Sequence, residues 1–331
     1  MTRLVLTLSL LLWGLFPGTS LATPIDSGEV RAFIDYMHRT HAFPVKSLEA
    51  WLAAAEKKDS ILEAISRPAE KVLSWKDYRR IFLTRDRIEK GHQFLVDHAD
   101  TFARVEDELG VAAPVVAAII GVETRYGGFT GRYRVIDALS TLAFHYPPRA
   151  PFFRDELEQY LLLSREQGFD PLTLKGSYAG AMGYGQFISS SYRAYAVDFD
   201  HDGTADILSN PTDAIGSVAN YFKRHGWHAG EPVAQRLQQP GKALRQLAVD
   251  RAELKPQHTL VDLKEAGARL SVDLPADAPV NVLSLEGEDG REYWATFHNF
   301  YVITRYNHSN LYAMAVHNLA RALAREPEEE Q

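Results

Sequence analysis

Apolar residues recur at helical spacing through the first third of the chain, from Ser27 to about Gly110. Ser47 is expected to cap a helix whose apolar positions at 48, 51, 52 and 55 share one face. Residues 84–109 show the same spacing among charged residues, which predicts one longer amphipathic helix. The aromatic residues between these segments are expected to pack in the core, as large aromatics usually do: Trp75, Tyr78 and Phe82.

The pattern changes twice further along. From Ala112 to about Trp227, helical runs alternate with stretches rich in glycine, small residues and aromatics. Residues 280–285 and 292–297 then read as strands joined by a turn at 287–290, and helical spacing returns at 311–324. The pattern predicts a mainly α, α+β protein with a small β region before its last helix.

These shifts suggest where the chain divides. We expect the following parts: a signal peptide at 1–22, an N-terminal helical domain at 23–110 whose first part can pack on the core, a core at 111–230, a small β-containing domain at 231–298, a return to the core with the C-terminal helix at 299–325, and an acidic tail at 326–331.

The N-terminus has the plan of a cleavable secretory signal. A short basic start with Arg3 precedes an apolar stretch at 4–16, and the small-residue site at 20–22 follows, so cleavage is expected after Ala22. An uncleaved anchor is the alternative, but the apolar stretch is shorter than the roughly 20 residues of a spanning helix. We therefore expect an exported, soluble protein.

Composition and charge exclude several classes. The 331 residues are 46% hydrophobic and 24% charged, an ordinary globular composition, and they include no cysteine. Disulfide frameworks, thiol catalysis, cysteine-ligated metals and lipids attached through cysteine are therefore excluded. The net charge of −7 gives no electrostatic footprint for nucleic acid or for an anionic membrane surface.

A single carboxylate follows the most apolar helix of the sequence. Pro114 suits the first turn of a helix, residues 115–122 are apolar on every face, and Gly127 and Gly128 are expected to end it just after Glu123. Burial and the C-terminal end of the helix dipole would both raise the pKa of such a carboxyl group. Glu123 could then donate a proton as a general acid, or it could form a salt bridge with Arg125 or another arginine.

A second motif predicts a bound cation. Residues 198–206 reproduce the first half of an EF-hand loop, with Asp198, Asp200 and Asp202 at alternate positions before a glycine and Thr204 after it. Ser209 stands where the loop's last glutamate would be. The alternative is a solvated acidic turn with Asp213 as a helix cap.

Four stretches resemble one family of enzymes. They are GVETRYGGFTGRYRVIDALSTLAFHYPPRAPFFRDELE (121–158), LKGSYAGAMGYGQF (174–187), DAIGSVANYFKRHGW (213–227) and NFYVITRYNHSNLYAMAV (299–316). In this order and without gaps, they are similar to the lytic murein transglycosylase B family. The resemblance implies a lysozyme-like catalytic core flanked by an α domain and a small β domain.

The resemblance also implies the reaction. Enzymes of this family cleave the β-1,4 bond between N-acetylmuramic acid and N-acetylglucosamine of peptidoglycan without water, leaving a 1,6-anhydromuramoyl end. One glutamate, which corresponds to Glu123, acts as acid and then as base, and no cofactor is needed for catalysis. A second carboxylate is not required, so Asp137 and Asp155 are interpreted as structural.

Further site residues follow from the same resemblance. Those implied to contact the glycan are Ser177, Gln186, Arg149, Tyr221, Tyr306, Asn307, Tyr312 and Tyr78. Phe152 stands where the family can carry a tyrosine, and Gly183 and Gly185 would permit close backbone approach. The family's cation loop closes with a carboxylate that corresponds to Asp213, so a structural calcium is expected at Asp198, Asp200, Asp202, Thr204 and Asp213. His308 is interpreted as a groove or surface residue.

Two other functions remain open on the sequence. A hydrolytic muramidase could use the same fold and Glu123 but admit water, and a catalytically silent glycan-binding protein could keep the groove alone. The family's membrane-bound form carries a lipidated cysteine, so the absence of cysteine favours a soluble, periplasmic form without a lipid anchor. We expect this form to be a monomer. Its partners would be peptidoglycan glycan strands and, among proteins, cell-wall synthases or hydrolases.

Overall fold

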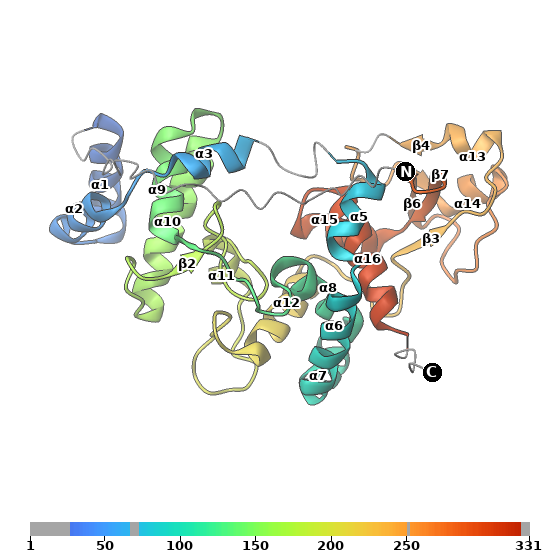
Figure 1. Cartoon of the computed structure of the whole chain (residues 1–331), viewed down its shortest axis with the longest axis horizontal. Coiled ribbons are helices and arrows are strands. Elements are labelled where there is room, and N and C mark those ends of the chain that lie inside the picture. Colours follow the sequence, from blue (N-terminus) through green and yellow to red (C-terminus); the bar gives the residue numbers. More distant parts are fainter. Residues whose placement is uncertain (1–26, 67–72, 250–251, 326–331) are drawn as a thin grey trace, which may run out of the picture.

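The computed structural model describes residues 27–66, 73–249 and 252–325. The predicted signal peptide and acidic tail lie outside this range. Helices dominate, as the apolar spacing predicts, and the strands between residues 234 and 296 gather at one end of the elongated molecule (Figure 1). Among the described residues, every helix is too short or too polar to cross a membrane.

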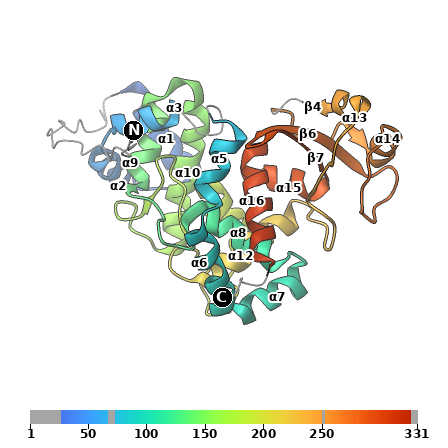
Figure 2. The ribbon, with the colours of Figure 1, turned by 45° about the vertical axis from the view of Figure 1, so that its right-hand side comes forward.

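The N-terminal part consists of six described helices. They are α1 (Gly28–His41), α2 (Val45–Ala54), α3 (Asp59–Ser66), α5 (Trp75–Phe82), α6 (Arg85–Asp97) and α7 (Ala99–Leu109). The first three pack beside α9 (Val135–His145) and α10 (Ala150–Gln167). Helices α5 and α6 lie at the other side of the molecule, against the last helix, α16 (Asn310–Leu323) (Figures 1 and 2). An ion pair between Arg154 and Glu29, 2.9 Å long, joins α10 to α1.

Two of the predicted helix boundaries are wrong. Helix α2 begins at Val45 rather than after Ser47, because the carbonyl of Pro44 accepts the amide protons of Ser47 and Leu48. The predicted helix at 84–109 is broken at His98 into α6 and α7. A straight helix would separate Phe94 and Phe102 by about 12 Å along its axis, whereas the break lets their rings meet edge to face at 5.8 Å.

The central part carries the buried helix and the elements around it. These are α8 (Ala113–Thr124), α9 (Val135–His145), a 3₁₀ turn (Pro147–Arg149), α10 (Ala150–Gln167), α11 (Ser189–Tyr195) and α12 (Pro211–Arg224), with the short antiparallel strands β1 (Tyr133–Arg134) and β2 (Lys175–Gly176). The last two helices, α15 (His298–Tyr306) and α16 (Asn310–Leu323), complete the core. Residues 115–122 of α8 are all buried, and α6, α7, α12 and α16 surround it (Figure 2).

The β region has its own small core. Its elements are β3 (Ala234–Arg236), α13 (Lys242–Gln246), β4 (Ala248–Val249), β5 (His258–Thr259), α14 (Leu260–Glu265), β6 (Pro279–Gly287) and β7 (Gly290–Thr296). The strand order is β3-β7-β6-β4, β5 also pairs with β6, and only β4 runs parallel to its neighbour. The predicted hairpin is present, with Gly287 opposite Gly290 at its turn. Leu260, Val280, Ala295 and Phe297 belong to a cluster separate from the main core.

Helix α8 ends in an unusual way. It stops at Thr124 because Arg125 and Tyr126 are both left-handed, with φ of 53° and 61°, so the turn comes before the predicted glycine stop at 127. The chain reversal folds the Tyr126 ring back over Gly121 and Gly91. A Cβ atom at Gly121 would lie 2.6 Å from the Tyr126 hydroxyl, and one at Gly91 only 2.3 Å.

We therefore expect Gly121→Ala to destabilise the protein. The added methyl group must displace the Tyr126 ring, and such overpacking costs about 1–3 kcal/mol. The free energy of unfolding from urea titration is the measurement. Gly28→Ala is the matched control, because Gly28 is also helical and nothing lies within 4 Å of an added Cβ; equal stability of the two variants would contradict the packing argument.

Candidate active site

Glu123 lies half-buried in the last turn of α8, where an apolar helix meets the C-terminal helices. Its carboxylate accepts a 2.6 Å hydrogen bond from the hydroxyl of Tyr312 on α16. Thr124, the next residue, donates to the carbonyl of Tyr184 at 2.9 Å and accepts the amide proton of Gly127. The end of α8 is thus joined both to the glycine-rich loop and to α16.

Two tyrosines stand beside the carboxylate, the buried Tyr312 and the half-buried Tyr306. The rings of Tyr306 and Tyr312 are parallel, with centroids 6.4 Å apart, and the Tyr306 hydroxyl donates to the carbonyl of Gly185. Burial and then the charge of Glu123 raise the pKa of both tyrosines well above the ordinary value. Both therefore remain neutral hydrogen-bond donors over the whole physiological pH range.

The glycine-rich loop after β2 places Ser177 and Gln186. The Ser177 hydroxyl accepts the amide protons of Ala179 and Ala181 at 3.2 and 3.1 Å, so it holds the loop's own backbone. The Gln186 amide donates to the carbonyls of Thr130 and Gly183, both at 3.0 Å, and its backbone is left-handed.

Glycine at 183 and 185 allows the close approach that the sequence predicts. A Cβ at Gly183 would lie 2.3 Å from the carbonyl oxygen of Ile207, and one at Gly185 would lie 2.8 Å from the Tyr306 hydroxyl. Larger residues would push the loop away from the cation loop and from Tyr306.

A groove of about 680 Å³ runs past this loop, between α10, α11, α12 and α15. Five of the predicted glycan-binding residues line it: Arg149, Gln186, Tyr221, Tyr306 and Asn307. Phe152 and His308 line it as well. Glu123, Ser177, Tyr312 and Tyr78 are not among its lining residues, although Tyr306 connects the groove to the Glu123–Tyr312 pair.

Tyr78 and Tyr312 belong to the layer behind the groove. Tyr78 on α5 is 1% exposed, its ring packs on Phe82 at 5.0 Å, and its charge is among the influences on the Tyr312 pKa. The Tyr221 hydroxyl donates to the carbonyl of Arg305 at 2.6 Å, and its ring stacks on His225 at 3.9 Å. These two contacts fix the orientation of the Tyr221 ring, which lines the groove.

Sequence reasoning missed several groove residues, namely Phe153, Ile188, Ser190, Ser191, Ala194, Tyr195, His225 and Arg305. Most lie on α11 or one helical turn from a predicted residue. The signal that could have found His225 is its spacing, because it follows Tyr221 by four positions and so lies on the same helix face.

One end of the groove is cationic. The Arg149 guanidinium lies 4.2 Å from the centre of the Phe152 ring. Burial, followed by the charges of Arg305 and Arg149, lowers the pKa of His308. Neutral His308 between two arginines leaves a surface with hydrogen-bond donors and a positive charge for an extended polar ligand.

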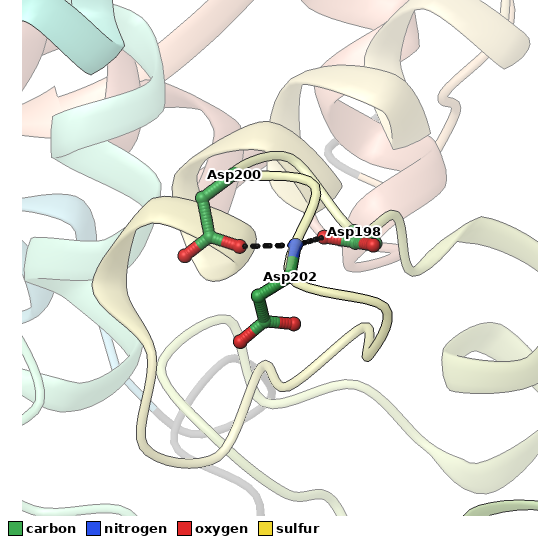
Figure 3. Close-up of side chains that lie close together, drawn as sticks. All are labelled: Asp198, Asp200 and Asp202. Carbon is green, nitrogen blue, oxygen red and sulfur yellow. Dashed lines mark hydrogen bonds between the residues drawn. The ribbon is translucent and has the colours of Figure 1, made fainter.

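Asp198, Asp200 and Asp202 converge in the loop between α11 and α12 (Figure 3). One oxygen from each carboxylate lies within 4.8 Å of the others. The amide of Asp202 donates to Asp198 at 3.0 Å and to Asp200 at 3.2 Å, which shapes the loop around these oxygens. The predicted ligand Thr204 follows on the same loop, where its amide donates to Asp202 at 2.9 Å.

Asp213 occupies a different position from the other predicted ligands. It is fully buried on α12, and its carboxylate accepts amide protons from Phe199 at 2.7 Å, Asp200 at 3.4 Å and Asp206 at 2.8 Å. Burial raises its pKa, and the bonds from Phe199 and Asp206 oppose that shift. Both of its oxygens thus hold the loop backbone, Oδ1 through Phe199 and Asp200 and Oδ2 through Asp206.

A helical core with a half-buried carboxylate beside a long groove of aromatic and polar side chains is the architecture of a lysozyme-like, glycan-cleaving enzyme. The chain belongs to the transglycosylase SLT domain family, whose model matches residues 26–321. The resemblance inferred from the sequence is therefore confirmed, as is the mainly α, lysozyme-like fold class.

Relatives cover nearly the whole chain. It is 42% identical over 308 residues to membrane-bound lytic murein transglycosylase B of Escherichia coli K12, covering 90% of this chain and 83% of that protein. The catenated lytic transglycosylase SltB1 of Pseudomonas aeruginosa is 51% identical, with a TM-score of 0.85 over 90% of this chain and 97% of the other. The E. coli lytic transglycosylase Slt35 in complex with calcium is 41% identical, with a TM-score of 0.82 over 92% and 96%.

We expect Asp213→Asn to destabilise the protein even when calcium is removed by a chelator. The substitution replaces one buried acceptor oxygen by an amide donor facing loop N–H groups, which costs about 1–3 kcal/mol. Urea unfolding in chelator is the measurement. Asp202→Asn, in the same loop but exposed, should leave the free energy of unfolding in chelator unchanged. If Asp213→Asn is as stable as the wild type in chelator, Asp213 acts only through the cation.

Proposed function

We propose that Glu123 is the acid and base with which this peptidoglycan lytic transglycosylase cleaves the bond between N-acetylmuramic acid and N-acetylglucosamine. The observation that carries the proposal is the half-buried carboxyl group of Glu123, oriented by the Tyr312 hydroxyl beside the groove residue Tyr306. A carboxyl group so placed can hold a proton next to a bound sugar.

Both half-reactions can use this one group. Protonated Glu123 gives its proton to the glycosidic oxygen as the bond from that oxygen to C1 of the muramoyl sugar breaks. The resulting carboxylate then takes the proton of the O6 hydroxyl as O6 bonds to C1, which forms the 1,6-anhydro ring and restores protonated Glu123. Water is neither consumed nor formed, and no cofactor takes part.

The surroundings of the other carboxylates support a single-carboxylate mechanism. Asp137 is buried and bound by the Arg134 guanidinium at 2.7 and 2.8 Å, and it also accepts the amide proton of Glu56. Asp155 is exposed on α10. Buried Glu156 accepts the hydroxyl and amide protons of Ser190 and so fixes the start of α11.

The groove would hold the glycan strand. Arg149, Gln186, Tyr221, Tyr306 and Asn307 are proposed to contact sugar rings, N-acetyl groups and hydroxyls. Ser177, Tyr312 and Tyr78 are proposed to hold the loop and the acid in place, with Tyr312 also in contact with the reacting carboxyl group. Export by the predicted signal peptide would place the enzyme in the periplasm, where its substrate lies.

We expect Glu123→Gln to lower the rate of anhydromuropeptide release from sacculi by about 100- to 10,000-fold, because an amide cannot transfer the proton. Chromatography and mass spectrometry of the released products measure it. Asp155→Asn should keep the wild-type rate. Release of muropeptides with a reducing muramic acid end by the wild-type enzyme would instead make it a hydrolytic muramidase.

A calcium ion fits the loop at 198–206. Three converging carboxylates are a hard oxygen donor set for Ca²⁺, and the related Slt35 structure is described as a calcium complex. Asp198, Asp200 and Asp202 would bind the ion, with Thr204 following on the loop and Asp213 holding its backbone. The ion would neutralise like charges and fix the loop to α12, which carries Tyr221.

Calcium is expected to raise the melting temperature, because a ligand that binds only the folded state at 100 times its Kd stabilises by about 2.7 kcal/mol. Scanning calorimetry in calcium and in chelator tests this. The double variant Asp198→Asn with Asp200→Asn should lose the calcium response, whereas Asp97→Asn, on exposed α6 surface, should keep it. An identical wild-type melting temperature in calcium and chelator would remove the site.

A further inference from the structure

A second cavity lies at the junction of the N-terminal helices, the last helix and the β region. Helices α5 and α16 run side by side next to the β6–β7 hairpin (Figures 1 and 2). Between them, a cavity of about 540 Å³ is lined by Trp75, Arg79, Ala234, Gln235, Arg236, Gln238, Glu292, Trp294, Asn318 and Arg321. It shares no residue with the groove beside Glu123. Its size is within the range of pockets that bind small ligands.

The cavity has more positive charge than its own acid can neutralise. Three guanidinium groups, from Arg79, Arg236 and Arg321, face one carboxylate, Glu292. That carboxylate already accepts the Trp294 indole proton at 3.1 Å and lies 3.8 Å from Arg236. Within the described part of the chain, Arg79 and Arg321 form no ion pair. Arg79 is half-buried, whereas Arg236 and Arg321 are exposed at the rim of the cavity. Guanidinium groups without a carboxylate partner favour an anionic ligand.

A buried hydrogen-bond donor supports the same conclusion. Trp75 is 2% exposed, and its indole N–H has no acceptor among the described residues. The Arg79 guanidinium lies 5.9 Å from the centre of the same indole ring. An unsatisfied buried donor costs free energy, which an acceptor oxygen on a bound ligand would recover.

The frame around the cavity is fixed from outside. Lys76 and Arg80, on α5, form ion pairs with Glu286 and Glu288 of the β6–β7 hairpin at 3.7 and 3.2 Å. These pairs hold α5 against the hairpin. They involve Lys76 and Arg80, which do not line the cavity. Of the three arginines that line the cavity, Arg236 is paired with Glu292, and Arg79 and Arg321 remain for a ligand.

We propose that this cavity binds a carboxylate-bearing peptide. An arginine guanidinium can bind a carboxylate through two parallel hydrogen bonds. The indoles of Trp75 and Trp294 can contact apolar side chains of a peptide, and the amides of Gln235 and Gln238 can bind its backbone. Two ligands share this chemistry. One is the peptide stem of peptidoglycan, and this assignment rests on the proposed function. The other is the chain's own residues 326–331, EPEEEQ.

Binding to catalytically inactive Glu123→Gln protein tests the proposal apart from turnover. We expect calorimetric titration with muramoyl pentapeptide, which has no glycosidic bond to cleave, to show binding. Arg79→Gln with Arg321→Gln should weaken it by at least about tenfold, since each charged hydrogen bond contributes about a factor of ten. Arg85→Gln with Arg325→Gln, which removes the same number of charges from exposed positions outside the cavity and leaves the contacts between α5 and the hairpin intact, should leave the Kd unchanged.

A chain that ends at Arg325 distinguishes the two sources. If the stem peptide is the ligand, it binds the full and shortened chains alike. If the chain's own end is the ligand, the stem peptide binds only the shortened chain, and a synthetic EPEEEQ peptide competes with it. The proposal is overturned if neither peptide binds either chain, or if the Arg79 and Arg321 substitutions leave binding unchanged. If Glu123→Gln is inactive but still binds the peptide, the peptide site and the role of Glu123 are both supported. If Glu123→Gln is active, only the assignment of Glu123 as acid and base is overturned.

Discussion

A carboxylate at the end of an entirely apolar helix cannot find a polar partner within that helix, and the rest of the structure supplies one. Tyr312 reaches Glu123 from 189 positions further along the chain. This bond requires α16 to lie along α8, so the chain must return to its core after forming the β region. Tyr306, stacked parallel to Tyr312, then connects the same helix pair to the loop carrying Gln186 and to the groove. Acid, loop and groove therefore depend on the docking of α16.

Local pattern predicts the parts of this arrangement that local physics decides. The buried helix α8 follows from eight apolar residues without a polar face, and the β6–β7 hairpin follows from alternation around a turn rich in glycine. The break at His98 does not follow, because it depends on Phe94 meeting Phe102 after the chain has turned. The end of α8 does not follow either: Arg125 and Tyr126 take left-handed conformations because Gly91, on another helix, leaves room for the Tyr126 ring.

The site residues also divide into those that the local sequence pattern predicts and those that it does not. The apolar run at 115–122 singles out Glu123, and the alternation of aspartates singles out the cation loop, but neither identifies Tyr312 or Tyr306 as neighbours of the acid. Only the family resemblance placed them near the glycan, and the structure brings Tyr312 into contact with Glu123. For Asp213, spacing cannot separate a cation ligand from a buried acceptor of loop amide protons, since both require a carboxylate just beyond the loop. The hydrogen bonds from Phe199 and Asp206 reveal the second role.

Net charge conceals how the arginines are distributed. The chain carries −7 overall, yet Arg149 and Arg305 line one end of the groove and Arg79, Arg236 and Arg321 line the separate cavity. Charge near a binding surface acts over about 8–10 Å at physiological salt, so these clusters act locally while the acidic remainder is screened. A sugar backbone offers hydroxyl and amide groups, whereas attached peptides offer carboxylates. An aromatic groove that is separate from an arginine-lined cavity therefore gives one chain two surfaces, which suit these two chemistries through different forces.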